Sequence, residues 1–303
     1  MMKVNTKIID PGYAMNYLVK EYGKLPRLED AVIPLKLHLF WHDKVLPPKM
    51  QKNVELLKRT NPEFEVVVYD GDMAREYIKT NFSGDVLHAY DTLIPISFKS
   101  DLFRYCVVYK EGGVYLDIKF EPVRGFKLLN FAKYREVWTS EKKYTINTCL
   151  IASTPCNPLL LRAIEMIKYN VENCVMGKSS TEVTGPQLLT LALLSIGDNY
   201  IKNIVNYFKY DIFKVKAVFT NNVDDFNSDS DNKLYLTTNG SGGCSLEDCV
   251  LVPIFQFYKG YREELSKLSP QVHWSKMWAK GADFVFRKDK DKDKDNHNDV
   301  YPV

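Results

Sequence analysis

Residues 97–120 read SFKSDLFRYCVVYKEGGVYLDIKF, and this stretch decides the fold. Apolar residues recur at helical spacing over its first half, and two glycines, Gly112 and Gly113, then end the helix and allow a tight turn. The following VYLDIKF alternates apolar with other side chains, which is typical of a strand. We therefore predict a helix, a glycine turn and a strand, with Asp117 near the strand's end and Lys119 two positions later.

The segments around this stretch repeat an alternation of strands and helices. Residues 34–42 and 64–72 are rich in β-prone residues, and each is followed by a helical pattern, over 47–60 and 73–82. Further strands are expected over 134–140, 145–154 and 247–258, and further helices after Pro158 and Pro186. This order predicts an α/β fold with a Rossmann-like, mostly parallel mixed sheet flanked by helices.

The chain divides into three parts by composition. Residues 1–32 are mixed and polar and are expected to form an arm. Residues 33–286 carry the strand and helix patterns of one domain. Residues 287–303 alternate lysine with aspartate and contain almost nothing apolar, so we predict a disordered tail.

The overall composition excludes several classes of function. A net charge of +3, from 41 basic and 38 acidic residues, does not indicate a nucleic-acid partner. No run approaches the roughly 18 apolar residues of a membrane span, and the N-terminus does not resemble a signal peptide. The six cysteines lack the paired spacing of a zinc site. These features predict a soluble, cytoplasmic protein with buried free thiols.

Three charged residues are the first candidates for chemistry. Asp117 follows a predicted buried strand, and ligands of open α/β sheets bind beyond such strand ends. Asp101 and Arg104 are three residues apart, so they share one face of the preceding helix. A solvated edge strand and a simple intrahelical ion pair would also explain this pattern. In the functional interpretation, Asp101 binds sugar hydroxyls and Arg104 binds a phosphate or sugar oxygen.

The order of several motifs resembles one known family. The segments IPLKLHLFW, SFKSDLFRYCVVYKEGGVYLDIKF, INTCLIASTPCNP, TGPQLLT and HWSKMW are similar to those of the DXD-containing sugar-transferase family 32, which includes fungal α-1,6-mannosyltransferases and has the clostridial glucosylating toxins as distant relatives. The resemblance runs from about Ile33 to Trp278. It implies a GT-A fold and a glycosyltransferase that moves a sugar, with retention, from a UDP- or GDP-sugar to a hydroxyl of a glycan or protein.

The resemblance also implies roles for individual residues. Trp41 would stack on the base of the donor, and Asp117 would be the first carboxylate of the DXD motif, touching ribose or metal. The loop with His273 and Trp278 would close over the diphosphate, and His273 would be a further metal ligand. The residues assigned to the donor as a set are His38, Trp41, Ser100, Asp101, Arg104, Tyr115, Asp117 and Trp278.

The sequence departs from the family where a metal would bind. The family implies Mn²⁺ or Mg²⁺, yet Lys119 replaces the second aspartate, which removes an oxygen ligand and adds repulsion. Lys276 also replaces a small or hydroxyl residue near Trp278. One hypothesis is that Lys119, with Lys276, supplies catalytic positive charge in place of metal. Another is that Glu121 binds metal together with Asp117.

Two further functions remain open at this point. A silent nucleotide-sugar-binding protein would also fit the altered Asp-Ile-Lys motif. An oxidoreductase that uses a dinucleotide is disfavoured, because no G-x-G-x-x-G follows the first strand. The high asparagine, lysine and tyrosine content is typical of an AT-rich genome, such as that of a large virus.

Overall fold

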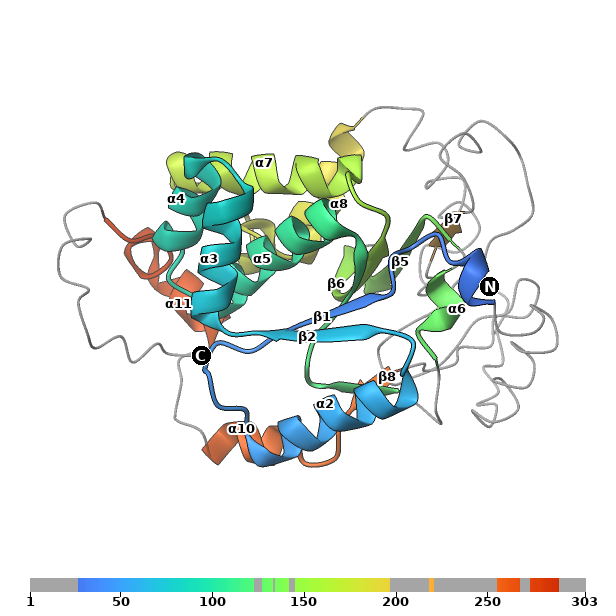
Figure 1. Ribbon diagram of the computed structural model, residues 1–303. Helices are drawn as coiled ribbons and strands as arrows, with labels where there is room; N and C mark the ends of the chain where they lie inside the picture. The colour runs from blue at the N-terminus through green and yellow to red at the C-terminus, as the bar shows by residue number, and fades with distance from the viewer. Residues whose placement is uncertain are drawn as a thin grey trace, which may run out of the picture.

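The fold is built around one six-stranded sheet. The computed structural model describes residues 27–122, 127–132, 134–141, 145–196, 218–220, 255–267 and 273–288. The strand order is β2-β1-β3-β6-β5-β7 (Figure 1). The strands are β1 (Lys36–Phe40), β2 (Glu65–Tyr69), β3 (Gly113–Leu116), β5 (Glu136–Glu141), β6 (Thr145–Ser153) and β7 (Val218–Thr220). A small second sheet pairs β4 (Phe120–Pro122) with β8 (Phe255–Phe257).

The sheet is mixed, as predicted. Strand β1 runs parallel to β2 and β3, whereas the β3–β6, β6–β5 and β5–β7 pairs are antiparallel. Fewer of the strand pairs are therefore parallel than the sequence indicated. Strands β5 and β6 are separated only by residues 142–144, and a connection this short can join antiparallel strands but not parallel ones.

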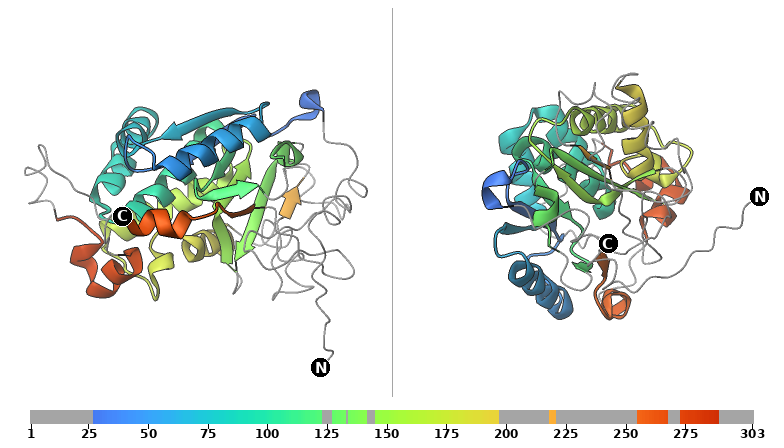
Figure 2. Two further views of the ribbon diagram at one scale, coloured as in Figure 1. Left: turned by 90° about the horizontal axis from the view of Figure 1, so that it is seen from below. Right: turned by 90° about the vertical axis from the view of Figure 1, so that its right-hand side faces the viewer.

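Helices cover both faces of the sheet. They are α2 (Pro48–Thr60), α3 (Gly71–Asn81), α4 (Gly84–Thr92), α5 (Ile96–Glu111), α6 (Leu129–Ala132), α7 (Pro158–Glu172), α8 (Pro186–Ser195), α10 (Tyr261–Lys267) and α11 (Trp274–Lys280), with short 3₁₀ turns at Leu28–Asp30, Ser180–Glu182 and Ala282–Phe284. Helices α3, α4, α5, α7 and α8 lie on one side, and α2 and α10 lie on the other (Figures 1 and 2). The α/β class flanked by helices is confirmed. Helix α4 was not predicted.

Alternation along the strands divides the apolar core into two layers. Phe40, Tyr115 and Ile151 pack toward the layer of α3, α5 and α7. Their strand neighbours Leu116 and Leu150 pack toward α2 and α6. Since successive side chains of a strand point to opposite faces, each central strand is buried on both sides. Strand β3 is thus a central strand, and the solvated-edge interpretation of its sequence is wrong.

Helix α5 is buried around its whole circumference. All residues from Phe98 to Val108 are buried, because the sheet, α3, α7 and α11 surround the helix. The single apolar stripe expected from the sequence is therefore too narrow. Asp101 and Arg104 lie inside the protein, where a charge is costly unless it is paired and hydrogen-bonded.

Some sequence predictions fall outside the described part of the chain. These include most of the arm (residues 1–26), the tail from residue 289, Cys244 and Cys249. The other four cysteines are free; Cys106 is buried, but Cys156 and Cys174 are exposed, contrary to the prediction of buried thiols. No helix in the described ranges combines the length and apolar character needed to cross a bilayer.

The two glycines between α5 and β3 have conformations that other residues rarely adopt. Gly112 has a φ of 69° and Gly113 a φ of 92°. A Cβ on Gly113 would lie 2.7 Å from the carbonyl oxygen of Lys36 in β1. The turn that places β3 beside β1 therefore needs glycine for its backbone angle and for the lack of a side chain.

We expect Gly113→Ala to lower the free energy of unfolding by about 2 kcal/mol or more, through backbone strain and the clash with Lys36. Urea unfolding followed by circular dichroism measures this change. Gly84→Ala is the matched control: Gly84 lies in a helix with nothing within 4 Å of an added Cβ, so a change within about 1 kcal/mol is expected. Equal losses in the two variants would contradict the argument.

Candidate active site

Three sequence segments meet at one edge of the sheet: the ends of the parallel strands β1 and β3, and the middle of the antiparallel strand β6. In the register of β1 with β3, His38 lies opposite Tyr115, so both strands end at the same edge. The residues that leave these strands are Trp41 and Asp117. The antiparallel strand β6 passes the same point, where the backbone N–H of Asp117 donates to the carbonyl of Cys149 at 2.8 Å. The carboxyl edge of a sheet is where open α/β folds bind ligands.

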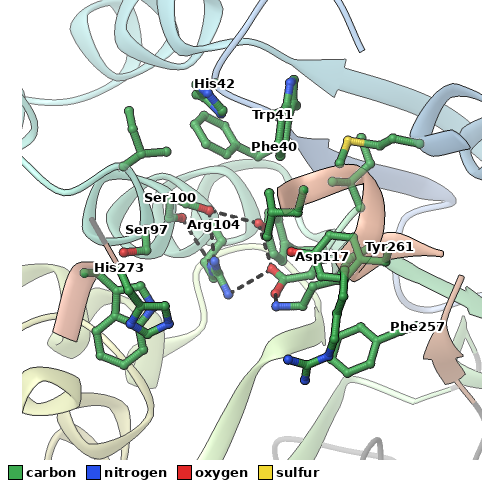
Figure 3. Close-up of a pocket in the computed structure, with 18 of the residues that line it drawn as sticks. Phe40, Trp41, His42, Ser97, Ser100, Arg104, Asp117, Phe257, Tyr261 and His273 are labelled. Carbon is green, nitrogen blue, oxygen red and sulfur yellow. Dashed lines mark hydrogen bonds and ion pairs between the residues drawn. The ribbon is translucent and has the colours of Figure 1, made fainter. Parts of the chain in front are cut away.

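A cavity of about 700 Å³ opens at this edge (Figure 3). Its walls come from the end of β1, the first turns of α5, the turn after β3, helix α10 and the start of α11. The residues used below are Trp41, His42, Ser97, Ser100, Arg104, Tyr115, Asp117, Lys119, Phe257, Tyr261, Arg262, His273 and Trp274.

Four charged side chains form a chain of ion pairs at the cavity floor. Asp101 Oδ1 lies 3.3 Å from Arg104 Nη2, Arg104 Nη1 lies 3.2 Å from Asp117 Oδ1, and Asp117 Oδ2 lies 2.8 Å from Lys119 Nζ. The signs alternate, so the formal charges sum to zero. Arg104 is the least exposed member, at 6% of its side-chain surface, and Lys119 the most exposed, at 27%. The chain therefore leads from the core to the cavity and ends in an ammonium group.

Arg104 is the centre of this arrangement. Its Nε donates to the carbonyl of Ser100, Nη1 to the carbonyl of Thr148 at 2.7 Å, and Nη2 to Ser100 Oγ at 2.9 Å. A guanidinium has five N–H groups; three of them make these hydrogen bonds, and two carboxylates lie within ion-pair distance of Nη1 and Nη2. The guanidinium also lies 4.6 Å from the ring centroid of Tyr115. Arg104 thus makes its hydrogen bonds and ion pairs with the protein itself, at the floor of the cavity.

Asp101 lies behind Arg104 and does not line the cavity. Its Oδ2 accepts a 2.8 Å hydrogen bond from Thr184 Oγ1, and Tyr105 holds the same threonine by donating to its carbonyl. Burial raises the pKa of Asp101, against the opposing effects of Arg104 and Thr184. In this position the carboxylate orients Arg104, so it is a positioning residue in this structure.

Asp117 is held as a carboxylate. Burial pushes its pKa upward, but Lys119 and Arg104 outweigh burial and bring the pKa to about 2. Tyr115 adds a hydrogen bond from its hydroxyl to Oδ1 at 3.2 Å. At neutral pH the group is ionised, and both its oxygens are engaged by cations.

The turn that carries Lys119 is fixed from the opposite face of the sheet. The side-chain amide of Asn53, buried on α2, donates to the carbonyls of Ile118 and Phe120, each at 2.8 Å. The backbone N–H of Tyr258 donates to the carbonyl of Lys119 at 3.1 Å. Burial lowers the pKa of Lys119, but Asp117 more than compensates, and the net shift is upward. Lys119 is therefore a positioned, permanently charged ammonium.

These residues do not fit a divalent metal ion. Among the described residues, no group of three or more His, Cys, Asp and Glu side chains is arranged to hold one. Asp117 is already neutralised by two cations, and the lysine ammonium stands against its outer oxygen. Glu121, on β4, is not part of the cavity lining, and His273 Nδ1 is engaged with Ser275 Oγ at 2.7 Å. Mn²⁺ and Mg²⁺ prefer several oxygen ligands, which this site lacks.

The other predicted donor residues differ in their placement. Trp41 and Ser100 line the cavity, and Trp41 packs against His42 with ring centroids 4.4 Å apart. His38 is fully buried away from the lining, and its Nε2 pairs with the carbonyl of Gly112 at 3.0 Å. Trp278 is also outside the lining, where its Nε1 donates to the carbonyl of Met176. Donor-binding roles for His38 and Trp278 stay predictions without support from this placement.

Several contributors to the site were missed by sequence reasoning. Thr184 belongs to the T-G-P motif before α8, so a polar residue at a predicted helix start was an available signal. Asn53 contributes its side-chain amide and Thr148 its backbone carbonyl. Both are far in sequence from the residues that they bind, and no sequence pattern identified these contacts. Trp274, in place of Trp278, lines the cavity because α11 turns the earlier of the two tryptophans inward.

The mixed α/β sheet has a cavity with an aspartate at its carboxyl edge, an arrangement that suits the class of sugar-binding transferase domains that the sequence resembles. Residues 47–144 match the family model described as a glycosyltransferase sugar-binding region containing DXD motif. Over these residues the chain is similar to the sugar-binding region of the DXD-containing glycosyltransferases, and the predicted resemblance is confirmed.

Curated relatives point to the same family. The chain is 30% identical over 90 residues to inositol phosphoceramide mannosyltransferase 3 of Schizosaccharomyces pombe, a match covering 30% of this chain and 25% of the relative. It is 30% identical over 89 residues to an uncharacterised glycosyltransferase of Acanthamoeba polyphaga mimivirus, covering 29% of this chain and 36% of that protein. The chain thus spans about a third or less of these relatives' length.

Among solved structures, the PaToxG glycosyltransferase is similar to 65% of this chain over 80% of its own length, with 18% sequence identity and a TM-score of 0.46. The ligand-free glycosyltransferase domain from the YGT toxin is similar to 60% of this chain over 73% of its own length, with 9% identity and a TM-score of 0.36.

The depressed pKa of Asp117 gives a prediction for stability against pH. A carboxyl group whose pKa is lowered on folding stabilises the native state above its unfolded pKa, near 4, and this contribution is lost as the pH falls toward 2. Asp117→Asn removes the ion-pair partner of Lys119 and leaves the buried Arg104 with Asp101 alone, so at pH 7 it should cost about 3 kcal/mol. The difference from wild type should shrink below about pH 4.

Urea unfolding measured from pH 7 to pH 3 tests this expectation. Asp283→Asn is the control, since Asp283 is 68% exposed and pairs only with Lys288 among the described residues. It should change the free energy of unfolding by less than about 1 kcal/mol at every pH. A deficit for Asp117→Asn that is constant over the whole pH range would contradict the assigned ion pairs.

Proposed function

We propose that this protein is a glycosyltransferase that moves a sugar from a UDP- or GDP-sugar to a hydroxyl of a glycan or protein acceptor without a divalent metal. The observation that carries this proposal is the ion chain that ends in Lys119 inside the cavity. Lys119 lies within the matched residues 47–144, and the resemblance of the sequence implies that the family motif has its second aspartate at this position.

In the proposed reaction, Lys119 stabilises the diphosphate as it leaves the sugar. Negative charge develops on the leaving oxygen, and a preorganised cation near it lowers the barrier. An ammonium has three N–H groups, of which Asp117 engages one, so others can reach a phosphate oxygen. Tyr258 holds the carbonyl of Lys119 and Asn53 holds the carbonyls of its two neighbours, so the cation needs little rearrangement during the reaction.

The remaining donor contacts follow from the walls of the cavity. Trp41 and His42, at the end of β1, offer an aromatic surface for the nucleotide base. Ser97 lines the cavity, and its buried Oγ has no hydrogen-bond partner within the described residues. A buried hydroxyl without a partner favours a ligand atom there, and we assign it to a sugar or phosphate oxygen.

The name of the fungal relative indicates which nucleotide-sugar donor to test first. The fungal relative acts, by its name, as a mannosyltransferase, so GDP-mannose is the leading donor. The chain covers only a quarter of that relative, and UDP-glucose is therefore the second donor in the same screen.

Lys119→Asp restores a DXD motif and gives the sharpest test of the metal-free site. Wild type should bind and hydrolyse its donor equally with EDTA and with Mn²⁺. Lys119→Ala should lose activity by about 100-fold, comparable to removal of one transition-state donor. Lys119→Asp should regain part of that loss only when Mn²⁺ is added, because a second carboxylate creates an oxygen-ligand pair.

Lys276→Ala is the matched control. Lys276 is exposed and lies outside the cavity lining, so its removal should leave activity within about twofold of wild type if the charge effect belongs to Lys119. Strict dependence of the wild type on Mn²⁺ would refute the metal-free proposal. Donor binding without turnover in wild type would favour the alternative, a silent nucleotide-sugar-binding protein.

We further propose that the anomeric configuration is retained. The described cavity lining offers one carboxylate, Asp117, and it is paired with two cations. It is therefore a poor general base for an acceptor hydroxyl, and an inverting transferase requires such a base. Proton NMR of the early product from an α-linked donor should show an α-linkage. A β-linked product would overturn retention and direct attention to His42 and His273 as bases.

A further inference from the structure

Helix α10 has one side toward the cavity and is anchored by the other. The residues that line the cavity are Tyr261, Arg262, Leu265 and Ser266. The two glutamates of the helix bind α2 and Tyr258, the residue that follows β8, instead. Glu264 accepts hydrogen bonds from the backbone N–H of Lys49 at 2.8 Å and from the hydroxyl of Tyr258 at 2.7 Å, and Glu263 lies 3.5 Å from Lys49 Nζ. This attachment fixes the inward side of α10 as a wall of the cavity.

The wall contains a stack of nearly parallel aromatic rings. Phe120 and Phe257 have centroids 5.0 Å apart and planes 15° apart, and Phe257 and Tyr261 have centroids 5.5 Å apart and planes 7° apart. Phe257 remains 44% exposed. Such a rigid, partly exposed aromatic surface beside polar groups suits the flat apolar face of another ring.

Cations lie next to these rings. The guanidinium of Arg262 is 5.7 Å from the centroid of Phe257, and Lys119 Nζ is 5.9 Å from the same ring. Lys119 is paired with Asp117, whereas Arg262 has no ion pair among the residues that the structure describes. A guanidinium fork that lines a cavity beside an aromatic plate binds phosphate or carboxylate groups well.

This wall and the Trp41 wall lie on opposite sides of Asp117. Figure 3 shows Trp41 and His42 above the ion chain and Phe257 below it. One planar ligand cannot stack on both, and a transfer reaction needs two organic ligands on either side of the reacting centre. Trp41 already provides the aromatic contact for a base, so the α10 wall is left for the second ligand.

We propose that the α10 wall is the acceptor subsite, and that it binds a ring-bearing polyol with an anionic group attached to the ring. This inference rests on the proposed glycosyltransferase function and specifies its acceptor. Phe257 and Tyr261 contact the face of the ring, and Arg262 binds the anion. A hydroxyl of the same ring is then directed toward the sugar held above Asp117 and Lys119.

Binding of small probes to the full chain, saturated with UDP or GDP, tests the subsite. Mannose 6-phosphate and glucuronate represent the phosphate and the carboxylate, and mannose and inorganic phosphate represent each half alone. NMR titration should show that at least one of the two anionic sugars binds about tenfold more tightly than either half, because ring and anion are recognised together. The preferred probe identifies the anion.

Variants on α10 connect this binding to the wall. Arg262→Gln should weaken the preferred anionic sugar about tenfold and leave mannose unchanged, because it removes the charged fork alone. Tyr261→Leu should weaken both sugars, because it removes the ring contact. Lys267→Gln is the matched control on the same helix, with the same loss of charge outside the cavity lining, and should change neither. Nucleotide affinity should be unchanged in all three variants.

Two results would overturn the inference. One is a fall in nucleotide affinity in Arg262→Gln or Tyr261→Leu, which would assign the wall to the donor. The other is no binding of any anionic sugar to the nucleotide-saturated protein. Failure of the wild type to bind UDP or GDP would overturn the proposed function instead. The two failures can be distinguished, because titrations of the anionic sugars without nucleotide still report whether Arg262 binds them.

Discussion

A full positive charge in the interior at Arg104 is the constraint on which the site depends. The side chain is 6% exposed, and an unpaired charge there would cost several kcal/mol. The structure compensates it with Asp101 and Asp117 and with carbonyl oxygens from α5 and β6. These groups come from α5, from the residue that follows β3 and from β6, so the guanidinium connects these three elements at the carboxyl edge.

The same constraint explains how a lysine fits at position 119, where the resemblance implies a carboxylate. Asp101, Arg104 and Asp117 alone carry a net charge of −1, and a divalent ion or a cationic side chain can balance it. Lys119 supplies +1 and brings the chain to neutrality, and Asn53 of α2 holds the backbone carbonyls on either side of it. A metal ion added to this neutral chain would need to displace the ammonium from Asp117. The change at one position therefore alters the chemistry of the site without requiring a change in the fold.

Sequence patterns predicted the local structure and part of the site. The alternation in residues 114–119 and the glycine pair located the strand end at Asp117, and the three-residue spacing of Asp101 and Arg104 placed them on one helical face. The pattern did not show that α5 is buried on every side, because burial depends on which helices pack around it. It therefore assigned Asp101 and Arg104 directly to a ligand, although their hydrogen bonds are directed to the protein. Asn53 and Thr148 could not be found this way, since a buried amide or a backbone carbonyl leaves no periodic signal.

The ion chain forms a fixed floor of the cavity, whereas the walls keep free binding groups, and this difference determines which residues can select a ligand. The ion chain has nearly all of its hydrogen-bonding capacity engaged within the protein, so it can orient charge but can recognise few ligand groups. Recognition must then fall to side chains with capacity left, which are Ser97, Lys119 and the aromatic and cationic residues of the two walls. Changes in Tyr261 or Arg262 would alter the acceptor without disturbing the charge balance at Arg104. Substitutions within the floor would instead affect folding and catalysis together, because the same contacts serve both.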